Sequence, residues 1–444
     1  MMFVYMWKGI KLLKKFFLGI ILLVLLIIAV PRAESKDYTL NEVYKEALKS
    51  SEKIKVSEEN LFIAKIGKNK AWSLLIPKLA AYGTYNHFSD QKFSDAGVLL
   101  QPNESGNWGM RMDEAFSVSL RELSALRVAG QTITKNEYDL DATKSDFILA
   151  VASAYYDVLK AKKSLEIASD NVTRLSQYRD SVDKRVKVGQ LTKTSLLRAE
   201  SELSGAHSDY IKAANALELY RSILIRITGI EENFTLKETL QPAEENVSLE
   251  RMRKIALDSR ADLKSFDIQR TIADEQVKYA WGAFWPSLDL FAIYQRNDQD
   301  PPGQSLNRES VMAGVSLSFP FFEGGLRIAE LKETKAKLRQ AKLFYDDFKK
   351  NVDVELESAY LDLQTQKGTL KFLEDQLAFA RDNYKAVLRQ FENGLAVSLD
   401  VMDANSLLLS SERNLAEALY NYQLAYLKVK RSIGTLLQFV TTGN

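Results

Sequence analysis

The sequence contains no cysteine and only two histidines among its 444 residues. Without cysteine there is no disulfide, no thiolate metal ligand and no cysteine nucleophile, and two histidines leave almost no material for a metal centre or a catalytic triad. No glycine-rich phosphate loop is present either. We therefore expect this protein not to be an enzyme and to bind no cofactor or metal.

Glycine and proline are also scarce, with 20 and 8 residues. Because these residues end helices and strands, their scarcity predicts long elements, and helices are the elements that run long. The 60 basic and 58 acidic residues nearly cancel, leaving a formal charge of +2. A balance of this kind lacks the basic stripe of a nucleic-acid-binding protein, so we expect no nucleic-acid partner.

The N-terminus has the pattern of an export signal. Lysines precede an unbroken apolar run from Phe16 to Val30, and Ala33 offers a small residue for cleavage. The run is shorter than the roughly 20 residues of a membrane-spanning helix. We interpret residues 1–33 as a signal peptide. The alternative is an uncleaved N-terminal helix that anchors the chain.

The chain repeats itself. Residues 40–85 match 249–294 without a gap, pairing Trp72 with Trp281 and Pro77 with Pro286, and a second match pairs Gly189 with Gly394. Repeats of this length indicate two copies of one structural plan. We predict a first repeat over 34–230, a surface linker over 231–247, a second repeat over 248–437 and a C-terminal tail over 438–444.

The hydrophobic period in each repeat predicts long coiled-coil hairpins. Two apolar heptad rows run through the second repeat, at Val352, Ala359, Gln366, Leu373, Ala380 and Val387 and at Leu356, Leu363, Leu370, Leu377, Tyr384 and Phe391. The first repeat carries the same rows 205 residues earlier, with a polar break at Arg179. Such rows form a left-handed coiled-coil seam. Gly189 and Gly394 then end each long helix and turn the chain into a second helix.

Between the helices the period drops to two, which indicates strands. We predict them at about 78–87, 114–122, 286–296 and 310–319. The fold class is therefore mainly α with a small β part. Four strands are too few to close a barrel, because the smallest closed barrels need about eight. Their apolar outer faces are typical of an outer-membrane barrel, so we expect several chains to pool their strands.

These features resemble the TolC-like outer-membrane efflux channels, also called outer membrane factors. The resemblance covers about Leu40 to Leu437 and rests on the duplicated helix-strand-strand-helix-helix order. The best local matches are residues 319–325, 392–394, 399–404 and the first-half turn at 188–192. The first half departs from the family pattern at 120–129, where the Pro-Phe-Phe-Glu-Gly-Gly sequence of the second half is missing.

The resemblance implies a homotrimer in the outer membrane, with twelve strands in one barrel and twelve helices in a periplasmic tunnel. It implies the exit duct of a tripartite efflux pump or a type I secretion system. The implied partners are outer-membrane lipid, a periplasmic adaptor protein and, through it, an inner-membrane pump of the RND or ABC type. An alternative from the sequence alone is a coiled-coil spacer or adaptor held by the uncleaved N-terminal helix.

The resemblance also supplies candidate site residues. Family members narrow their periplasmic end with acidic side chains after the second-half turn, where this chain has Asp400 and Asp403, and with an aromatic matched by Phe391. The family's Asp–Arg latch is absent, and we consider Arg198 as a substitute partner for the acidic ring. Carboxylates in a first helical turn are also favoured by the helix dipole alone.

The two hairpin turns are the expected contact with the adaptor. The residues are Val188, Gly189, Gln190, Leu191 and Thr192 in the first half and Asn393, Gly394 and Leu395 in the second. The simpler interpretation is that both glycines only end their helices.

Overall fold

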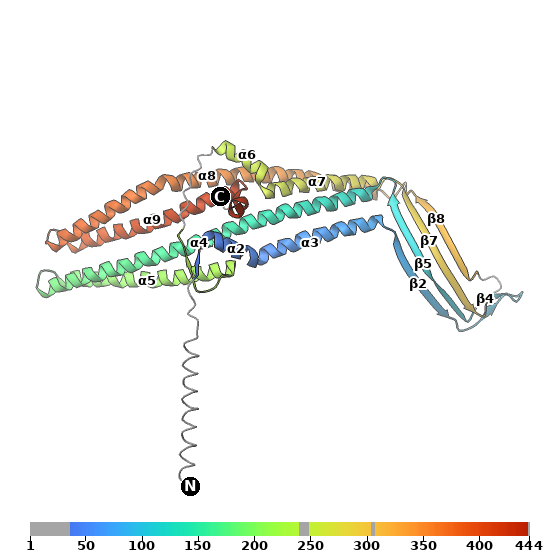
Figure 1. The fold of residues 1–444 in the computed structure, drawn as a ribbon, viewed down its shortest axis with the longest axis horizontal. Helices are drawn as coiled ribbons and strands as arrows, with labels where there is room; N and C mark the ends of the chain where they lie inside the picture. The colour runs from blue at the N-terminus through green and yellow to red at the C-terminus, as the bar shows by residue number, and fades with distance from the viewer. Residues whose placement is uncertain (1–35, 239–247, 303–306, 443–444) are drawn as a thin grey trace, which may run out of the picture.

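The computed structural model describes residues 36–238, 248–302 and 307–442, so the predicted signal peptide lies outside the described residues. The molecule is elongated, with an antiparallel sheet at one end and two helical turns at the other (Figure 1). This arrangement confirms the predicted fold class of a mainly α chain with a small β part. Among the described residues, no helix is long and apolar enough to cross a membrane.

Two equally long helices dominate the fold. Helix α4 (Arg121–Lys187) and helix α8 (Leu326–Glu392) each have 67 residues, or roughly 100 Å at 1.5 Å per residue. They turn back into α5 (Lys193–Thr228) and α9 (Ser398–Ser432). The heptad rows lie along the resulting seams, as shown by the burial of Val151 in α4 and Leu356 in α8.

Shorter helices support the sheet end and the middle of the molecule. Helices α3 (Glu52–Trp72) and α7 (Ala261–Gly282) pack against α4, and α7 also packs against α8. Each follows a short helix, α2 (Leu40–Ser50) or α6 (Leu249–Ser259). A 3-10 turn, η1 (Ser73–Leu75), links α3 to the sheet.

The main sheet has the strand order β2-β5-β7-β8. Its strands are β2 (Lys78–His87), β5 (Glu104–Ser117), β7 (Ser287–Asp300) and β8 (Glu309–Ser318). All neighbours are antiparallel. A small hairpin of β3 (Lys92–Phe93) and β4 (Leu99–Gln101) lies between β2 and β5.

The prediction for the second strand was wrong. It placed the strand at about 114–122, whereas β5 runs from Glu104 to Ser117 and the helix begins at Arg121. Residues 104–107 are polar and glycine-containing, and the alternation of Trp108, Met110 and Met112 that follows them was passed over. In the structure β5 pairs with β2 on one side and with all of β7 on the other. Backbone hydrogen bonding to two neighbours outweighs the weak local preference.

The predicted linker and tail also contain structure. Within 231–247, Phe234–Leu236 forms β6, which pairs in parallel with β1 (Lys36–Tyr38). Phe234 and Leu236 are buried against the hydrophobic core, which a surface linker does not explain. Residues 239–247 lie outside the described residues. In the predicted tail, α10 (Leu436–Thr442) packs Phe439 against Tyr426 at a ring distance of 6.2 Å.

The sheet-to-helix connections of the two repeats differ chemically but share a backbone conformation. Gly325 precedes α8 with φ of 86°, and Leu120, 205 residues earlier, precedes α4 with φ of 54°. Leucine rarely adopts this left-handed region. The first repeat therefore keeps the turn of the second without its glycine.

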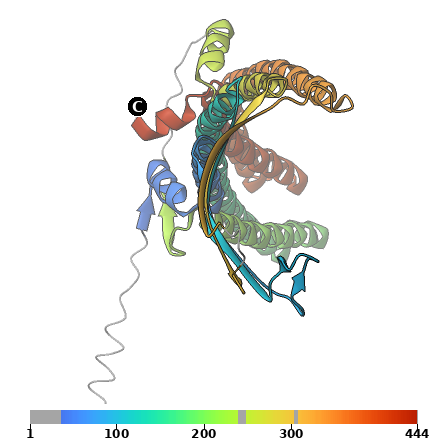
Figure 2. The same ribbon diagram turned by 90° about the vertical axis from the view of Figure 1, so that its right-hand side faces the viewer.

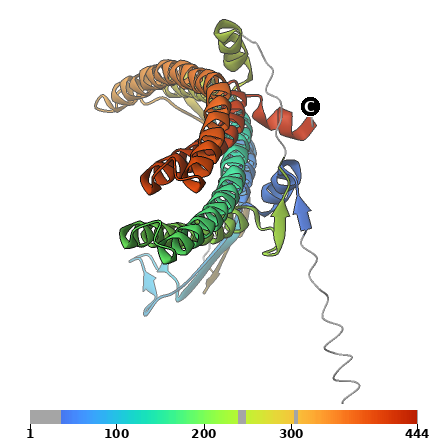
Figure 3. The same ribbon diagram turned by 90° about the vertical axis from the view of Figure 1, so that its left-hand side faces the viewer.

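Viewed from either end, the helices form an arc and the sheet follows the same curvature (Figures 2 and 3). Helices α2 and α10 and the β1–β6 pair lie on the convex side of the arc. The chain therefore has an open concave side that runs from the sheet to the turns.

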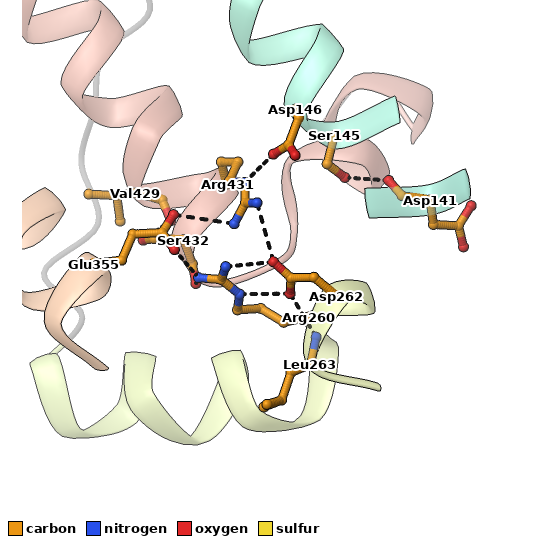
Figure 4. A network of polar contacts seen from close by, with 10 residues as sticks. All are labelled: Asp141, Ser145, Asp146, Arg260, Asp262, Leu263, Glu355, Val429, Arg431 and Ser432. Atoms are coloured by element: carbon orange, nitrogen blue, oxygen red, sulfur yellow. Dashed lines mark hydrogen bonds and ion pairs between the residues drawn. The ribbon is translucent and has the colours of Figure 1, made fainter. Parts of the chain in front are cut away.

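A buried ion network joins the two repeats near the middle of the molecule (Figure 4). The Arg260 side chain is 2% exposed and pairs with Asp262 at 2.6 Å and Glu355 at 2.8 Å. Arg431 of α9 pairs with Asp146 of α4 at 2.7 Å and also contacts Asp262. Gly434 makes this packing possible, since a Cβ there would lie 2.8 Å from the Arg260 backbone.

The first prediction concerns Asp262. Its burial raises the carboxyl pKa, but Arg260 and Arg431 outweigh burial and hold the pKa below its usual value. Asp262→Ala leaves a buried arginine underpaired, at an expected cost of about 3 kcal/mol. Thermal unfolding followed by circular dichroism in detergent measures the loss, and Asp274→Ala in an exposed ion pair is the control.

The pH dependence gives a second readout of the same network. The stabilisation by Asp262 is complete above its unfolded pKa of about 3.9 and is lost as the pH falls through the lower folded value. Asp262→Asn is therefore expected to flatten the decrease in melting temperature below about pH 4. An unchanged acid profile would contradict the assigned role.

Candidate functional site

The two hairpin turns lie at the same end of the molecule, opposite the sheet (Figure 1). Gly189 and Gly394 have φ of 75° and 76°, the left-handed conformation that ends a helix. Gln190 then donates its N–H to the Arg185 carbonyl and Leu395 donates to the Gln390 carbonyl, both at 2.8 Å. The two turns are therefore the same Schellman-type cap built twice.

Apolar side chains of both turns face solvent in the protomer. Leu395 is 81% exposed and Val188 is 69% exposed, whereas Leu191 is half-buried. Polar groups complete the ends of the helices: Thr192 Oγ1 accepts the Ser195 N–H at 3.3 Å, and Asn393 donates to the Arg389 carbonyl at 2.8 Å. The turns are rigidly capped and still present apolar surface.

Asp400 has a local structural role. Its Oδ2 accepts the Val397 N–H at 2.9 Å, so the carboxylate caps the first turn of α9. The alternative explanation by helix-end electrostatics therefore applies to Asp400. Its side chain is nonetheless exposed.

Asp403 and Arg198 are both exposed, on α9 and α5 respectively. Asp403 shares a face with Asp400, while the intervening Val401 and Met402 are buried. Within the described part of the chain, no ion pair joins Arg198 to Asp400 or Asp403. The substitute latch predicted from the sequence is not formed inside one protomer.

Phe391 does not line an opening in this structure, which corrects the expectation from the resemblance. Its side chain is 2% exposed and packs against Tyr178 with ring centroids 5.3 Å apart. The ring belongs to a hydrophobic cluster that also contains Val182 and Val401. Phe391 therefore joins the two hairpins to each other near the turns.

Two residues of α4 clamp the second hairpin, and sequence reasoning missed both. Arg185 donates to the Phe391 carbonyl at 2.8 Å and to the Glu392 carbonyl, and its guanidinium lies 5.1 Å from the Phe391 ring centre. Tyr178 donates to Ser398 Oγ at 2.7 Å. Burial raises the pKa of the Tyr178 hydroxyl above its ordinary value, which already lies well above neutral pH. We call Tyr178 and Arg185 the tip clamp.

The tip clamp continues a polar stripe along the face of α4 that meets α9. Asn171 accepts from Asn405 at 2.9 Å, and Arg174 pairs with Glu412 at 3.0 Å. Successive residues of this stripe on α4 are three, four and seven positions apart: Asn171, Arg174, Tyr178 and Arg185. This helical spacing could have identified the residues from the sequence. A search for apolar rows does not find them, because the stripe is polar.

No group of three or more metal-ligating side chains gathers in the ranges that the structure describes. The arrangement consists of two capped turns, an acidic exposed face and a clamp between hairpins. Such a site can position, contact or separate helices.

We expect the tip clamp to govern local opening of the second turn. Arg185→Gln removes a charged donor from two carbonyls at the end of α8, worth about 1.5 kcal/mol or more. Hydrogen exchange of residues 388–398 is then expected to accelerate about tenfold, as measured by mass spectrometry. The matched control is Lys187→Gln, because Lys187 forms a local i,i+4 ion pair with Asp183 at 2.7 Å on the same helix. Equal rates in the two variants would contradict the clamp.

The sequence is similar to those of known outer-membrane proteins. The family model described as outer membrane efflux protein matches residues 43–229 and again 252–435. The outer membrane protein TolC of Vibrio cholerae is 25% identical over 384 residues, covering 82% of this chain and 83% of its own. The alkaline protease secretion protein AprF of Pseudomonas aeruginosa is 22% identical over 302 residues, covering 66% of this chain and 62% of its own.

A solved structure shares the fold. The Campylobacter jejuni CmeC outer membrane channel superposes with a TM-score of 0.80 at 17% sequence identity, covering 89% of this chain and 86% of that one. The family model matches both halves of the sequence, which together make up most of the chain. The chain therefore belongs to the outer membrane efflux protein family.

Proposed function

We propose that three copies of this chain close into one continuous duct. The chain itself is an outer-membrane channel for efflux or secretion, with its helices extending into the periplasm. The proposal adds the stoichiometry, the partners and the residues at the periplasmic end. An anchored coiled-coil spacer is not favoured, since it gives no reason for the sheet.

The observation that carries the trimer is the pair of free sheet edges. In the described sheet, β2 and β8 each have one strand neighbour, and every residue of β2 is exposed. Unpaired edges cannot face lipid, because each exposed N–H and C=O group would be unsatisfied. Pairing β8 of one copy with β2 of the next satisfies both edges and generates a ring.

The outermost helices of the arc carry exposed apolar side chains at similar distances from the turns. Helix α8, at one side of the arc, exposes Phe372 and Phe379 by 73% each, and α5, at the other side, exposes Tyr210 by 40% and Ile211 by 58%. In a monomer these side chains meet water. In a closed ring they are available to pack against the neighbouring copy.

Aromatic residues support the position of the membrane boundary. Trp72, Trp281 and Trp285 lie where helices meet strands and are 48%, 51% and 58% exposed. Core packing was the alternative explanation, but these exposures favour the amphipathic boundary between membrane and water. Strands of 10 to 14 residues satisfy the length of about 9 to 11 that a membrane strand needs.

The turns are the proposed docking site for a periplasmic adaptor protein, which connects the duct to an inner-membrane pump. Val188 and Leu395 are strongly exposed at the end farthest from the sheet. Both sit on rigid Schellman-type caps, so their display requires little ordering on binding. We propose that conduction through the duct is passive and that the pump supplies the energy.

Asp400 and Asp403 form the proposed acidic aperture. Threefold repetition would place six carboxylates at the periplasmic end, and rings of carboxylates select for cations. Arg198 lacks an ion pair with either aspartate within its own protomer, so its proposed partner is Asp403 of a neighbouring copy. This contact would serve as the latch in place of the family's Asp–Arg pair.

The trimer is tested through the exposed stripe of α8. Phe372→Asp with Phe379→Asp is expected to convert trimer into monomer, because desolvating the new charges opposes subunit packing. Light scattering of the detergent-solubilised protein after size exclusion measures the oligomer. Phe372→Leu with Phe379→Leu should remain trimeric. A stable trimer with both aspartates would contradict the proposed interface.

The aperture is tested by ion selectivity in planar bilayers. Asp403→Asn is expected to lower the cation preference without disturbing α9, since Asp403 caps nothing in the described structure. Asp400→Asn should do the same while also weakening the α9 cap. The control is Asp382→Asn. Asp382 is an exposed carboxylate on α8, farther from the turn than the aperture residues. Unchanged selectivity in both aperture variants would refute the acidic ring.

A further inference from the structure

The chain between β2 and β5 forms an ordered hairpin beyond the end of the sheet. Ser94 donates its N–H to the Val98 carbonyl at 2.9 Å, and Ser94 Oγ accepts the Val98 N–H at 3.1 Å. Gly97 completes the turn with φ of 75°. Gln101 donates to the Asp90 carbonyl at 2.9 Å and ties the two arms together.

The base of this hairpin is fixed to the sheet. Phe88 donates to the Asn103 carbonyl at 2.8 Å, and Asn103 donates to the Asp300 carbonyl at 3.0 Å. These bonds continue the ladders that end at the pairs His87–Glu104 and Glu104–Asp300. The direction of the hairpin is therefore set by the sheet.

The hairpin lies on the concave side of the molecule. It extends past the sheet in Figure 1, and Figures 2 and 3, taken from opposite ends, both place it on the side toward which the helices curve. In a closed ring the concave side encloses the channel axis. The hairpin therefore projects over the outer mouth.

Three of its exposed side chains are large and apolar, and the charged side chains of Asp90, Lys92 and Asp95 are exposed beside them. Phe93 and Val98 are each 55% exposed and Leu100 is 66% exposed. Nothing in the described protomer covers them. An apolar group of this kind, held on an ordered support, is typical of a contact surface.

The radius of the barrel, compared with the length of the hairpin, indicates that the hairpins of neighbouring copies cover this surface. Twelve strands about 4.8 Å apart and tilted by about 40° enclose a radius of about 12 Å. The arm from Phe88 to Asp95 has eight residues and bends at Ser89–Asp90, so its reach is shorter than the roughly 26 Å of a fully extended segment. Even half of that extended length, about 13 Å, matches the barrel radius, so three hairpins directed inward meet near the axis.

We propose that the three β3–β4 hairpins of the trimer contact each other through Phe93, Val98 and Leu100 and form an apolar lid that narrows the outer mouth. The inference rests on the proposed trimer. It gives the duct a second constriction, at the end opposite the acidic aperture and built from different chemistry. Cargo leaving the duct must separate the hairpins.

The absence of cysteine allows a direct test. Ala96→Cys, at the hairpin turn, introduces the sole thiol of each chain. Disulfide formation needs Cα atoms within about 7 Å, so contact between hairpins predicts disulfide-linked dimers on a denaturing gel after oxidation of dilute trimer. Ser310→Cys, on the barrel wall at the same end, is the control and should stay monomeric on the gel.

Light scattering of the same samples separates the two proposals. Absence of trimer would refute the proposed function, whereas intact trimer without Ala96→Cys cross-links would overturn the lid. A second variant tests the chemistry of the contact: Phe93→Ser, Val98→Ser and Leu100→Ser together in the Ala96→Cys chain. Cross-linking should fall severalfold while the trimer persists, and undiminished cross-linking would overturn the apolar contact.

Discussion

The unpaired backbone at the two edges of the sheet is the constraint on which the architecture depends. A four-stranded sheet in lipid leaves two rows of N–H and C=O groups without partners, and only closure with other copies satisfies them. The edge strands β2 and β8 lie above the exposed sides of α3 and α8. One geometric requirement therefore sets strand pairing, helix packing and the position of the channel axis together.

Duplication gives the two repeats the same plan but not the same surroundings. The helices α4 and α8 have equal length and matching heptads, yet α4 packs against α3, α5, α7 and α9, whereas α8 lies at the rim of the arc. Because α4 is central, it has one more contact face than α8. The polar stripe of α4 forms this face and contacts α9. The rim helix leaves an apolar face exposed, and this is the face that we propose packs against a neighbouring copy.

At the tip, each turn is rigid, and the two hairpins are held to each other by a small set of contacts. Each turn is locked by its own Schellman-type cap, while the two hairpins are held together by Phe391 packing and by the hydrogen bonds of Tyr178 and Arg185. Polar contacts between hairpins can be exchanged for water at a smaller net cost than an apolar seam. The surface between the hairpins therefore combines these polar contacts with the hydrophobic cluster around Phe391.

The sequence by itself determined the repeats, the long heptad helices, the glycine turns and three of the four barrel strands, because these depend on local period and on residues with special backbone freedom. It misplaced β5, where the short alternation of Trp108, Met110 and Met112 was passed over after polar residues, and it took Phe234–Leu236 for linker. It also assigned Phe391 to an opening and passed over Arg185. Only the tertiary structure decided these points, because burial and hydrogen-bond partners come from segments far apart in the chain.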